Sequence, residues 1–596
     1  MKFRFLLLLL CGVSLLALAQ QSPSPAPDFV MEKDVAVPMR DAVILRADVL
    51  RPRDTGAFPV LVYRTPYGKE PALLEYTTFR HAVEHGYAVV VQDVRGRYAS
   101  GGDFRPYENE GRDGFDTIEW AARQPWSNGA IGTFGLSYPG AVQWLAAVEN
   151  PPHLKAMVPA MTFSSAQNFF YAGGLWDMSW IEWIWDNIAP DVRSKRNLPG
   201  PKTPDEAIAA WDTAGPKMFN TLPLDQLQEL RGIAPYYYDW LTHPYDDPWW
   251  DWCDLRNKYG RVHAAVLNFS GWYDDNYGPE GATTNFVGLL RARAGPSDPQ
   301  THLLIGPWVH GVASTAKTKS GEREFGPAAA VDYDEIVLRW MDHYLRGAAN
   351  GVGNEKPVRY FVMGENRWHE ADAWPPASTA TSYYLVSSKP GEFRGSLSAN
   401  LPKEKESFAS FLSDPAKPVI NAYSTSGAHD YRQLAERQGL LTFDSAPLEQ
   451  DTEVTGPIQA QIYFSCDDCR DTDLWVRLLD VAPDGTAFNL MSPGLDVLRA
   501  SYRDQKKGRQ LLAPHRLYVL RLDHLITSNV FRKDHRIRVQ ISATFFPNFS
   551  RNLQSGELEN SSAKMQKANI SIYTDRRRPS RVILPVVSRP LQSSAR

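Results

Sequence analysis

The most informative run in the chain is Gly129-Ala130-Ile131-Gly132-Thr133-Phe134-Gly135-Leu136-Ser137-Tyr138-Pro139-Gly140. A short apolar run ends at a glycine and a serine, and helix-forming residues follow, which predicts a strand, a sharp turn and a helix. Ser137 lies on the turn, where its hydroxyl projects from the backbone and a neighbouring N–H can stabilise an oxyanion. The spacing departs from G-x-S-x-G because Pro139 replaces the second glycine. By itself the run fits a catalytic serine and an ordinary Gly/Ser loop equally well.

Patterns typical of buried strands and of helices alternate on both sides of this run. Residues 59–63 and 87–92 are short and apolar, and a helix-like segment separates them. The same strand pattern returns at residues 264–269. Strands that alternate with helices predict a parallel sheet. We therefore predict an α/β core made of residues 28–161 and 263–350.

A helical cap is predicted between the two halves of the core, over residues 162–262. The strand pattern stops there, and the segment holds nine of the chain's 18 tryptophans. Most of these aromatic residues are expected to form the cap's own core, and a minority to line a pocket for an apolar acyl group. The pocket candidates are Phe169, Trp176, Trp180 and, outside the cap, Trp272.

The C-terminal part has a different pattern. Residues 351–378 follow a glycine-rich stretch and are predicted to be a linker. From residue 379 to residue 596, short β-type runs are punctuated by Pro, Gly, Asn and Asp. This pattern predicts an all-β sandwich or jelly roll.

The overall composition narrows the classes of partner. Lys and Arg number 64 against 68 Asp and Glu, giving a net charge of −4, which offers no basic field for nucleic acid. Residues 1–19 combine a basic start, an apolar run and the small-residue pattern Ala17-Leu18-Ala19, which predicts a cleaved signal peptide and export to the periplasm or the medium. The apolar run is too short to span a membrane stably.

Neither a metal site nor an organic cofactor is expected. His81 and His85 lie four residues apart, but no third ligand accompanies them. Cys466 and Cys469 form a C-x-x-C, and Cys253 alone cannot complete a zinc site with them. In an exported chain the pair is expected to form a local disulfide.

Three loops carry the groups that nucleophilic hydrolysis needs: a hydroxyl, an imidazole and an orienting carboxylate. Ser137, Asp274 and His310 occur in the chain order typical of α/β hydrolases, each after a predicted strand. Asp275 is an alternative acid that only geometry can distinguish. For the oxyanion we expect two donors, the N–H of Tyr138 and the hydroxyl of Tyr67.

Several motifs, in order along the chain, resemble those of the CocE/NonD hydrolases, a family that includes cocaine esterase, α-amino-acid ester hydrolases and Xaa-prolyl dipeptidyl peptidases. They are R-T-P-Y-G-K (64–69), D-V-R-G-R (93–97), Q-P-W-S-N-G (124–129), G-L-S-Y-P-G (135–140), G-W-Y-D (271–274), G-P-W-V-H (306–310) and F-P-N-F-S-R-N (546–552). The resemblance implies an α/β-hydrolase core, an inserted cap and a C-terminal jelly roll. It also implies Ser137 as nucleophile, Asp274 as acid, His310 as base, and Tyr138 and Tyr67 as oxyanion donors.

One departure from the family concerns the substrate. The amino-acid ester hydrolases carry carboxylates two and three residues after the acid, where this chain has Asn276 and Tyr277. Without that counter-charge a buried ammonium is costly, although Asp275 and Asp177 are candidates to compensate. The sequence therefore predicts an exported serine hydrolase of small-molecule esters, or of amides. The alternatives are a Xaa-prolyl dipeptidyl peptidase, an α-amino-acid ester hydrolase or acylase, and a glycan-binding protein on an inactive scaffold.

Overall fold

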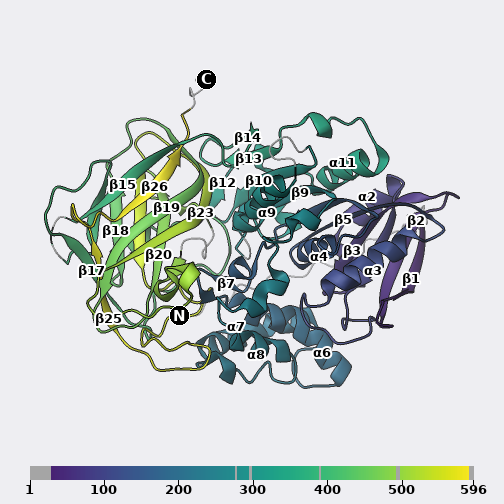
Figure 1. The fold of residues 1–596 in the computed structure, drawn as a ribbon, viewed down its shortest axis with the longest axis horizontal. Coiled ribbons are helices and arrows are strands. Elements are labelled where there is room, and N and C mark those ends of the chain that lie inside the picture. The colour runs from purple at the N-terminus through teal and green to yellow at the C-terminus, as the bar shows by residue number, and fades with distance from the viewer. Residues whose placement is uncertain are drawn as a thin grey trace, which may run out of the picture.

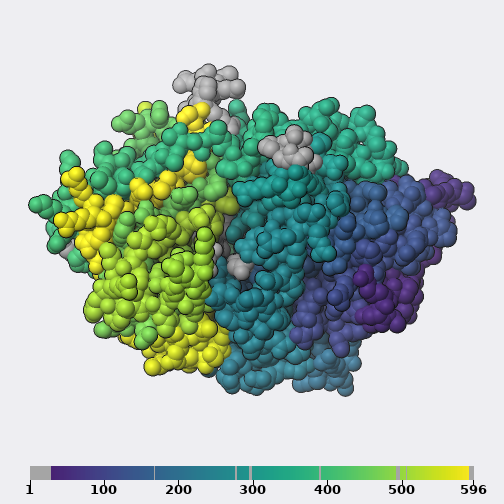
Figure 2. Space-filling model, viewed as in Figure 1, coloured from purple at the N-terminus to yellow at the C-terminus, as the bar shows by residue number. Residues whose placement is uncertain are grey.

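The computed structural model describes residues 29–275, 278–293, 299–387, 389, 391–491 and 497–588. The predicted signal peptide and the positions Asn276 and Tyr277 lie outside the described residues. Figure 1 shows three parts: a sheet flanked by helices on the right, a helical segment below it, and a β-rich C-terminal domain on the left. In Figure 2 the C-terminal domain lies directly against the rest of the molecule.

The first sheet has ten strands in the order β1-β2-β4-β3-β5-β6-β9-β10-β13-β14. The pairs from β4 to β13 are parallel, while β1, β2 and β14 join in antiparallel fashion. Because the parallel strands run in one direction, the loops after β3, β5, β9 and β10 leave from one edge of the sheet. The strands are β1 (Phe29–Pro38), β2 (Ile44–Pro52), β3 (Phe58–Thr65), β4 (Ala88–Asp93), β5 (Ser127–Leu136), β6 (Leu154–Ala160), β9 (Ala265–Tyr273), β10 (Thr301–Val309), β13 (Val358–Val362) and β14 (Arg367–Ala371).

Helices cover both faces of this sheet. In β3, Val60 and Val62 pack into one core with residues of α3 and α4, whereas Leu61 and Tyr63 pack into another with α2 and α11. Successive side chains of a strand point to opposite faces, so a strand covered on both sides is apolar throughout. The helices of this part are α1 (Lys69–Glu75), α2 (Thr78–Glu84), α3 (Glu110–Ala122), α4 (Tyr138–Ala147), α9 (Gly278–Ala292), α10 (Val312–Thr315) and α11 (Tyr333–Arg346).

The cap lies between β6 and β9. Its aromatic residues form a shared core in which the Phe170 ring lies 4.9 Å from that of Trp180 and 4.5 Å from that of Trp250. This packing supports the expectation that most of the cap's tryptophans stabilise the cap itself. The elements are β7 (Tyr171–Ala172), β8 (Leu175–Trp176), α5 (Ser179–Trp183), a π-helical turn (Ile184–Ile188), α6 (Ala189–Arg196), α7 (Pro204–Asn220), α8 (Pro235–Thr242) and short 3-10 turns.

The prediction that residues 351–378 form a linker is wrong for the central part of this range. Strands β13 and β14 lie within it and extend the first sheet, with β13 parallel to β10 and β14 antiparallel to β13. The physical reason is the run Val-Arg-Tyr-Phe-Val of β13, whose four apolar side chains are buried.

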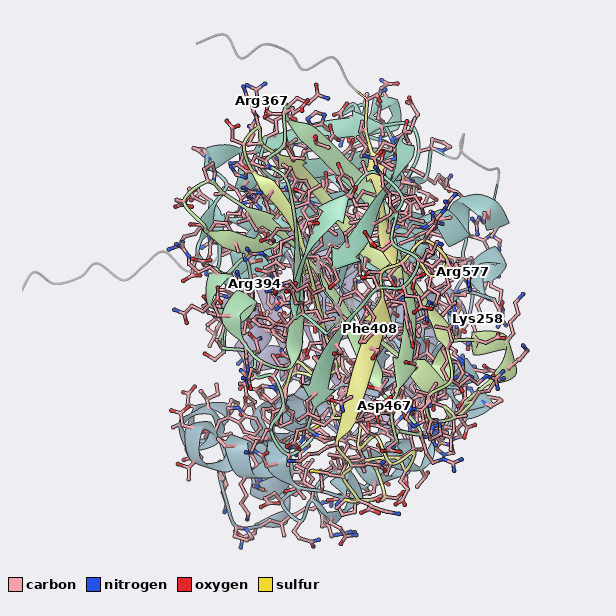
Figure 3. All side chains as sticks on the ribbon, turned by 90° about the vertical axis from the view of Figure 1, so that its left-hand side faces the viewer. Lys258, Arg367, Arg394, Phe408, Asp467 and Arg577 are labelled. Atoms are coloured by element: carbon pink, nitrogen blue, oxygen red, sulfur yellow. A yellow bond between two sulfur atoms is a disulfide. The ribbon has the colours of Figure 1, made fainter. Side chains whose placement is uncertain are left out.

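The C-terminal domain is a large β-sheet domain consistent with a β-sandwich, and its core is built from alternate residues of its strands. Figure 3 looks onto this domain, with Phe408 of β17 near the centre. Cys466 and Cys469 form the expected disulfide at the end of β19. The strands are β15 (Thr379–Ser387), β16 (Arg394–Ser398), β17 (Phe408–Ser413), β18 (Leu440–Ser445), β19 (Thr452–Cys466), β20 (Asp473–Val481), β21 (Ala487–Asn489), β22 (Val497–Arg499), β23 (Tyr518–Phe531), β24 (Arg536–Ser542), β25 (Ala568–Tyr573) and β26 (Arg581–Val586).

Candidate active site

Ser137 occupies the sharp turn between β5 and α4, as predicted. Its backbone has φ 68° and ψ −126°, a conformation that non-glycine residues adopt rarely and that often marks functional turns. The turn requires glycine on both sides: a Cβ at Gly135 would lie 2.6 Å from the Cβ of Pro139, and one at Gly140 would lie 2.6 Å from the carbonyl oxygen of Ala160. Ser137 is half-buried, whereas all ten residues of α4 are buried. Ser137 is therefore the residue of this turn that solvent or a substrate can reach.

Tyr138, the residue after the serine, is held in place at its backbone and at its side-chain hydroxyl. As the first residue of α4, it has an N–H without a partner inside the helix. Its buried hydroxyl donates to Glu110 Oε1 at 2.8 Å and accepts the N–H of Tyr107 at 3.1 Å. Glu110 in turn pairs with Arg64, at 2.9 Å between Oε2 and Nη2. This buried network holds the Tyr138 side chain, and the start of α4 sets the direction of its N–H, as an oxyanion donor requires.

Tyr67 lies in the loop after β3. Its hydroxyl accepts the indole N–H of Trp183, a residue of α5, at 3.0 Å. Burial raises the pKa of Tyr67 above its ordinary value of 10.0, and hydrogen bonds with Trp183 and Ser137 oppose that rise. The phenol is therefore neutral at physiological pH, next to Ser137, and keeps a proton to donate.

Asp274 and His310 meet because their strands are neighbours. In the parallel pair of β9 and β10, Tyr273 is in register with Val309, so the residues that follow leave the sheet side by side. The Nδ1 of His310 lies 2.8 Å from Oδ1 of Asp274, whose side chain is fully buried. A carboxylate on Nδ1 selects the tautomer whose Nε2 can accept a proton. The His310 side chain is 18% exposed, so its ring remains at the surface of the site.

The charges around His310 favour its protonated form. Burial lowers the pKa of His310, but the charge and hydrogen bond of Asp274, together with the charge of Asp275, raise it above its ordinary value of 6.5. Asp275 itself accepts a hydrogen bond from the hydroxyl of Ser426, in the C-terminal domain. Of the two carboxylates, Asp274 makes the hydrogen bond to the imidazole, and Asp275 acts on the imidazole through its charge.

The predicted pocket residues separate into two groups. Phe169, Trp176 and Trp180 are buried together in the aromatic core of the cap, at the base of α5. Trp272 is not brought together with them: it lies inside β9, is fully buried, and donates its indole N–H to the carbonyl of Phe361 at 2.7 Å. The half-buried Trp183, which the sequence analysis did not select, contacts Tyr67 instead.

Three carboxyl groups of the cap have raised pKa values. Burial raises the pKa of Asp177 and of Glu182 to about 7 each, and that of Asp186 to about 6. The charge of Asp275 adds to the rise at Asp177 and Glu182, so these groups lie close enough to repel one another. A bound cation would relieve that repulsion.

Two further features of the described residues bear on the chemistry. Within the described ranges, no group of three or more His, Cys, Asp or Glu side chains is arranged to hold a metal ion. In the same residues, no helix combines the length and the hydropathy that crossing a membrane requires.

Two family models match the chain. The X-Pro dipeptidyl-peptidase (S15 family) model matches residues 41–312, and the X-Pro dipeptidyl-peptidase C-terminal non-catalytic domain model matches residues 350–583. A cocaine esterase from Rhodococcus sp. (strain MB1 Bresler) is 32% identical over 590 residues, which cover 94% of this chain and 99% of that protein.

Solved structures share the architecture over nearly the whole chain. An aminopeptidase from a marine sediment archaeon (Thaumarchaeota archaeon) superposes with a TM-score of 0.80 at 23% identity, covering 96% of this chain and 99% of that one. An α-amino-acid ester hydrolase superposes with a TM-score of 0.78 at 23% identity, covering 97% and 100%. At such identities the likeness concerns the fold, an α/β-hydrolase core with a cap and a C-terminal β-domain.

Proposed function

The chain belongs to the CocE/NonD family of hydrolases, and on that premise we propose that it is an exported serine hydrolase that cleaves carboxylic esters through an acyl-enzyme on Ser137. The hydrogen bond of 2.8 Å between His310 and Asp274 carries the proposal. It joins residues that are 36 positions apart at the edge of the sheet from which Ser137 also projects. An imidazole held in this way is the base that a serine nucleophile requires.

The proposed reaction has two halves, formation of the acyl-enzyme and its hydrolysis, and His310 transfers a proton in both. Ser137 Oγ attacks the ester carbonyl while Nε2 of His310 takes its proton, and Asp274 stabilises the resulting imidazolium. The Tyr138 N–H and the Tyr67 hydroxyl donate to the oxyanion. As the C–O bond breaks, His310 gives its proton to the departing alcohol. A water molecule then attacks the acyl-enzyme with His310 as base, which releases the acid and restores Ser137.

Turnover of a p-nitrophenyl ester by the Ser137→Ala variant tests this mechanism. We expect kcat to fall by about 10⁴-fold or more, in line with removal of a serine nucleophile in other enzymes. Near-full activity in that variant would refute the proposal. Comparison with a proline-containing dipeptide anilide tests the peptidase alternative, since faster turnover of the anilide would favour it.

A second candidate substrate class is an acyl group with a free α-amine. The observation in its favour is the set of carboxyl groups formed by buried Asp177 and by half-buried Glu182 and Asp275. Asp275 accepts the Ser426 hydrogen bond, which supports its ionised form, and an ammonium beside it would gain a charge-assisted hydrogen bond.

Matched esters of one amino acid, with the amine free or acetylated, test this candidate. If the carboxyl groups receive the amine, the free amine is preferred, and Asp275→Asn or Glu182→Gln removes the preference without lowering turnover of the acetylated ester. The preference also falls below pH 7, where Asp177 and Glu182 become protonated. Equal kcat/KM for the two esters would exclude this substrate class.

Export rests on the leader of residues 1–19. The disulfide between Cys466 and Cys469 supports it, because disulfides persist mainly in oxidising compartments. N-terminal sequencing of the protein from cell fractions tests it: the expected mature chain begins at Gln20 and occurs outside the cytoplasm.

A further inference from the structure

The loop 546–552 of the C-terminal domain runs along the cap at the point where α5 begins. The N–H of Met178 donates to the carbonyl of Asn548 at 3.0 Å, and the N–H of Ser550 donates to the carbonyl of Trp176 at 2.9 Å. Between them Asp177 and Phe549 form an antiparallel bridge. Five of these six residues, all but Asn548, are at least 94% buried. The loop therefore adds a short β-ladder to the cap in a dry environment, where backbone hydrogen bonds are costly to lose.

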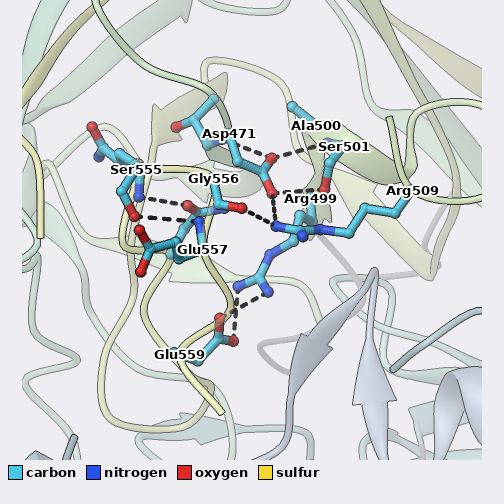
Figure 4. A network of polar contacts seen from close by, with 12 residues as sticks. Asp471, Arg499, Ala500, Ser501, Arg509, Ser555, Gly556, Glu557 and Glu559 are labelled. Carbon is cyan, nitrogen blue, oxygen red and sulfur yellow. Dashed lines mark hydrogen bonds and ion pairs between the residues drawn. The ribbon is translucent and has the colours of Figure 1, made fainter. Parts of the chain in front are cut away.

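The hydroxyl of Ser550 links this ladder to a buried ion pair. It accepts the N–H of Trp176 at 3.0 Å and donates its single proton to Oε1 of Glu559. Glu559 pairs with Arg499, at 3.0 Å between Oε1 and Nη2, as Figure 4 shows. With its proton given to the carboxylate, the hydroxyl presents only lone pairs to the cap, which fixes its role as an acceptor there.

Arg499 is itself locked in place and contacts the cap a second time. Its Nε donates to Oδ1 of Asp473 at 2.9 Å, and its backbone N–H donates to the carbonyl of Gly173 at 2.8 Å. A Cβ at Gly173 would lie 2.0 Å from the carbonyl oxygen of Val497, so the cap backbone approaches β22 as closely as only glycine permits. Arg499, Asp473 and Glu559 are each at least 98% buried.

The segment that this network holds leads directly to the proposed oxyanion hole. Helix α5 spans only Ser179–Trp183 and follows Met178 without an intervening loop. Its last residue, Trp183, donates its indole N–H to the Tyr67 hydroxyl at 3.0 Å. Trp183 lies only four residues after Ser179, in the first part of a helical run that continues through residues 184–196, so a shift at Met178 is transmitted to Trp183 and from there to Tyr67.

We propose that Ser550, supported by Glu559 and Arg499, is a positioning residue for catalysis: through the ladder to residues 176–178 and through α5 it sets the Tyr67 hydroxyl in the oxyanion hole. The inference rests on the proposed function, in which Tyr67 is a donor to the oxyanion. It assigns to the C-terminal domain a part in turnover, although that domain supplies no atom that touches the reacting carbonyl.

The test compares Ser550→Ala with Tyr67→Phe and with the double variant on a p-nitrophenyl ester. Loss of the Ser550 hydroxyl is expected to lower kcat roughly tenfold with KM nearly unchanged, because misplacing an oxyanion donor affects the transition state more than substrate binding. In the Tyr67→Phe background the same substitution should have almost no effect on kcat, since residues that act through one another are not additive.

Ser501 offers a matched control. Its hydroxyl donates to buried Asp471 at 2.6 Å in the same region (Figure 4), and this side chain is not part of the ladder to the cap. Ser501→Ala should keep kcat, and Ser550→Thr, which retains a hydroxyl, should restore most of the activity lost in Ser550→Ala. If Ser550→Ala does not fold, Ser550→Cys, whose thiol is a weaker hydrogen-bond donor, replaces it in the same comparison with Tyr67→Phe.

Three outcomes are distinguishable. An unchanged kcat in folded Ser550→Ala or Ser550→Cys would overturn the inference. So would an equal loss in the wild-type and Tyr67→Phe backgrounds, because Ser550 would then not act through Tyr67. If Tyr67→Phe alone leaves kcat unchanged, the oxyanion donor of the proposed function is wrong, and the inference falls with it for that separate reason.

Discussion

Replacing Asp274 and Asp275 by asparagine, one at a time, separates two carboxylates that are adjacent in sequence and differ in contacts. Asp274 Oδ1 lies 2.8 Å from Nδ1 of His310. An amide there can donate to Nδ1 and so stabilise the tautomer whose Nε2 already carries a proton. That tautomer cannot accept the Ser137 proton. In other enzymes with this arrangement the change costs about 10⁴ in kcat, or roughly 5 kcal/mol of transition-state stabilisation.

Asp275→Asn is expected to behave differently. Its carboxylate accepts the Ser426 hydrogen bond and acts on His310 through charge. Because that charge raises the pKa of His310, its removal should move the acid limb of the kcat/KM profile to lower pH, with kcat on an ester that lacks an amine kept within about tenfold of wild type.

The assay is hydrolysis of a p-nitrophenyl ester by both variants across pH 5 to 9, with circular dichroism to confirm folding. A loss in Asp275→Asn as large as that in Asp274→Asn would refute the assignment of roles. So would a shift of its acid limb to higher pH, because the sign of the charge effect would then be wrong.

Three further outcomes are expected. The kcat/KM of the wild type should rise with pH in a single step whose midpoint lies above pH 6.5. Only neutral His310 can accept the serine proton, and Asp274 and Asp275 raise the pKa of His310. A midpoint below pH 6.5 would contradict this. Tyr67→Phe should lower kcat by about 10²- to 10³-fold with little change in KM, as loss of one oxyanion donor does elsewhere, and an unchanged kcat would exclude the hydroxyl as donor. Gly271→Ala should lower the free energy of unfolding by about 1 to 3 kcal/mol, measured by urea titration. A Cβ at Gly271 would lie 2.2 Å from the carbonyl oxygen of Trp308 and would push β9 away from β10. Unchanged stability would contradict that packing.

The strand–turn–helix around Ser137 was predictable because its signals are local. Glycines at the turn and an apolar strand before it determine the backbone whatever lies elsewhere. The family resemblance implied Asp274 as the acid, but the residues alone left Asp275 open, because the choice depends on the register of β9 against β10, in which Tyr273 lies opposite Val309. Shifting that register by one residue would bring a different side chain to His310.

Strand β13 explains both the wrong linker and the position of Trp272. The glycines before residue 358 suggested a linker, and strand β13 was missed. Trp272 was named as a pocket candidate, whereas its indole packs against the missed strand and donates to Phe361. Ser426 had no local signal, and Ser550 lies in the motif F-P-N-F-S-R-N (546–552), which gave no indication of a contact with the cap. Ser426 contacts Asp275 across 151 positions and Ser550 contacts Trp176 of the cap across 374 positions, so only the packing of the C-terminal domain reveals these contacts.

Covalent labelling with a fluorophosphonate tests the central claim most directly. The reagent loses fluoride when an activated serine attacks its phosphorus, and mass spectrometry of peptides locates the adduct. We expect one adduct, on Ser137, formed much more slowly in His310→Ala. Esterase activity that persists without an adduct on Ser137, or an adduct that forms at the same rate without His310, would contradict the account.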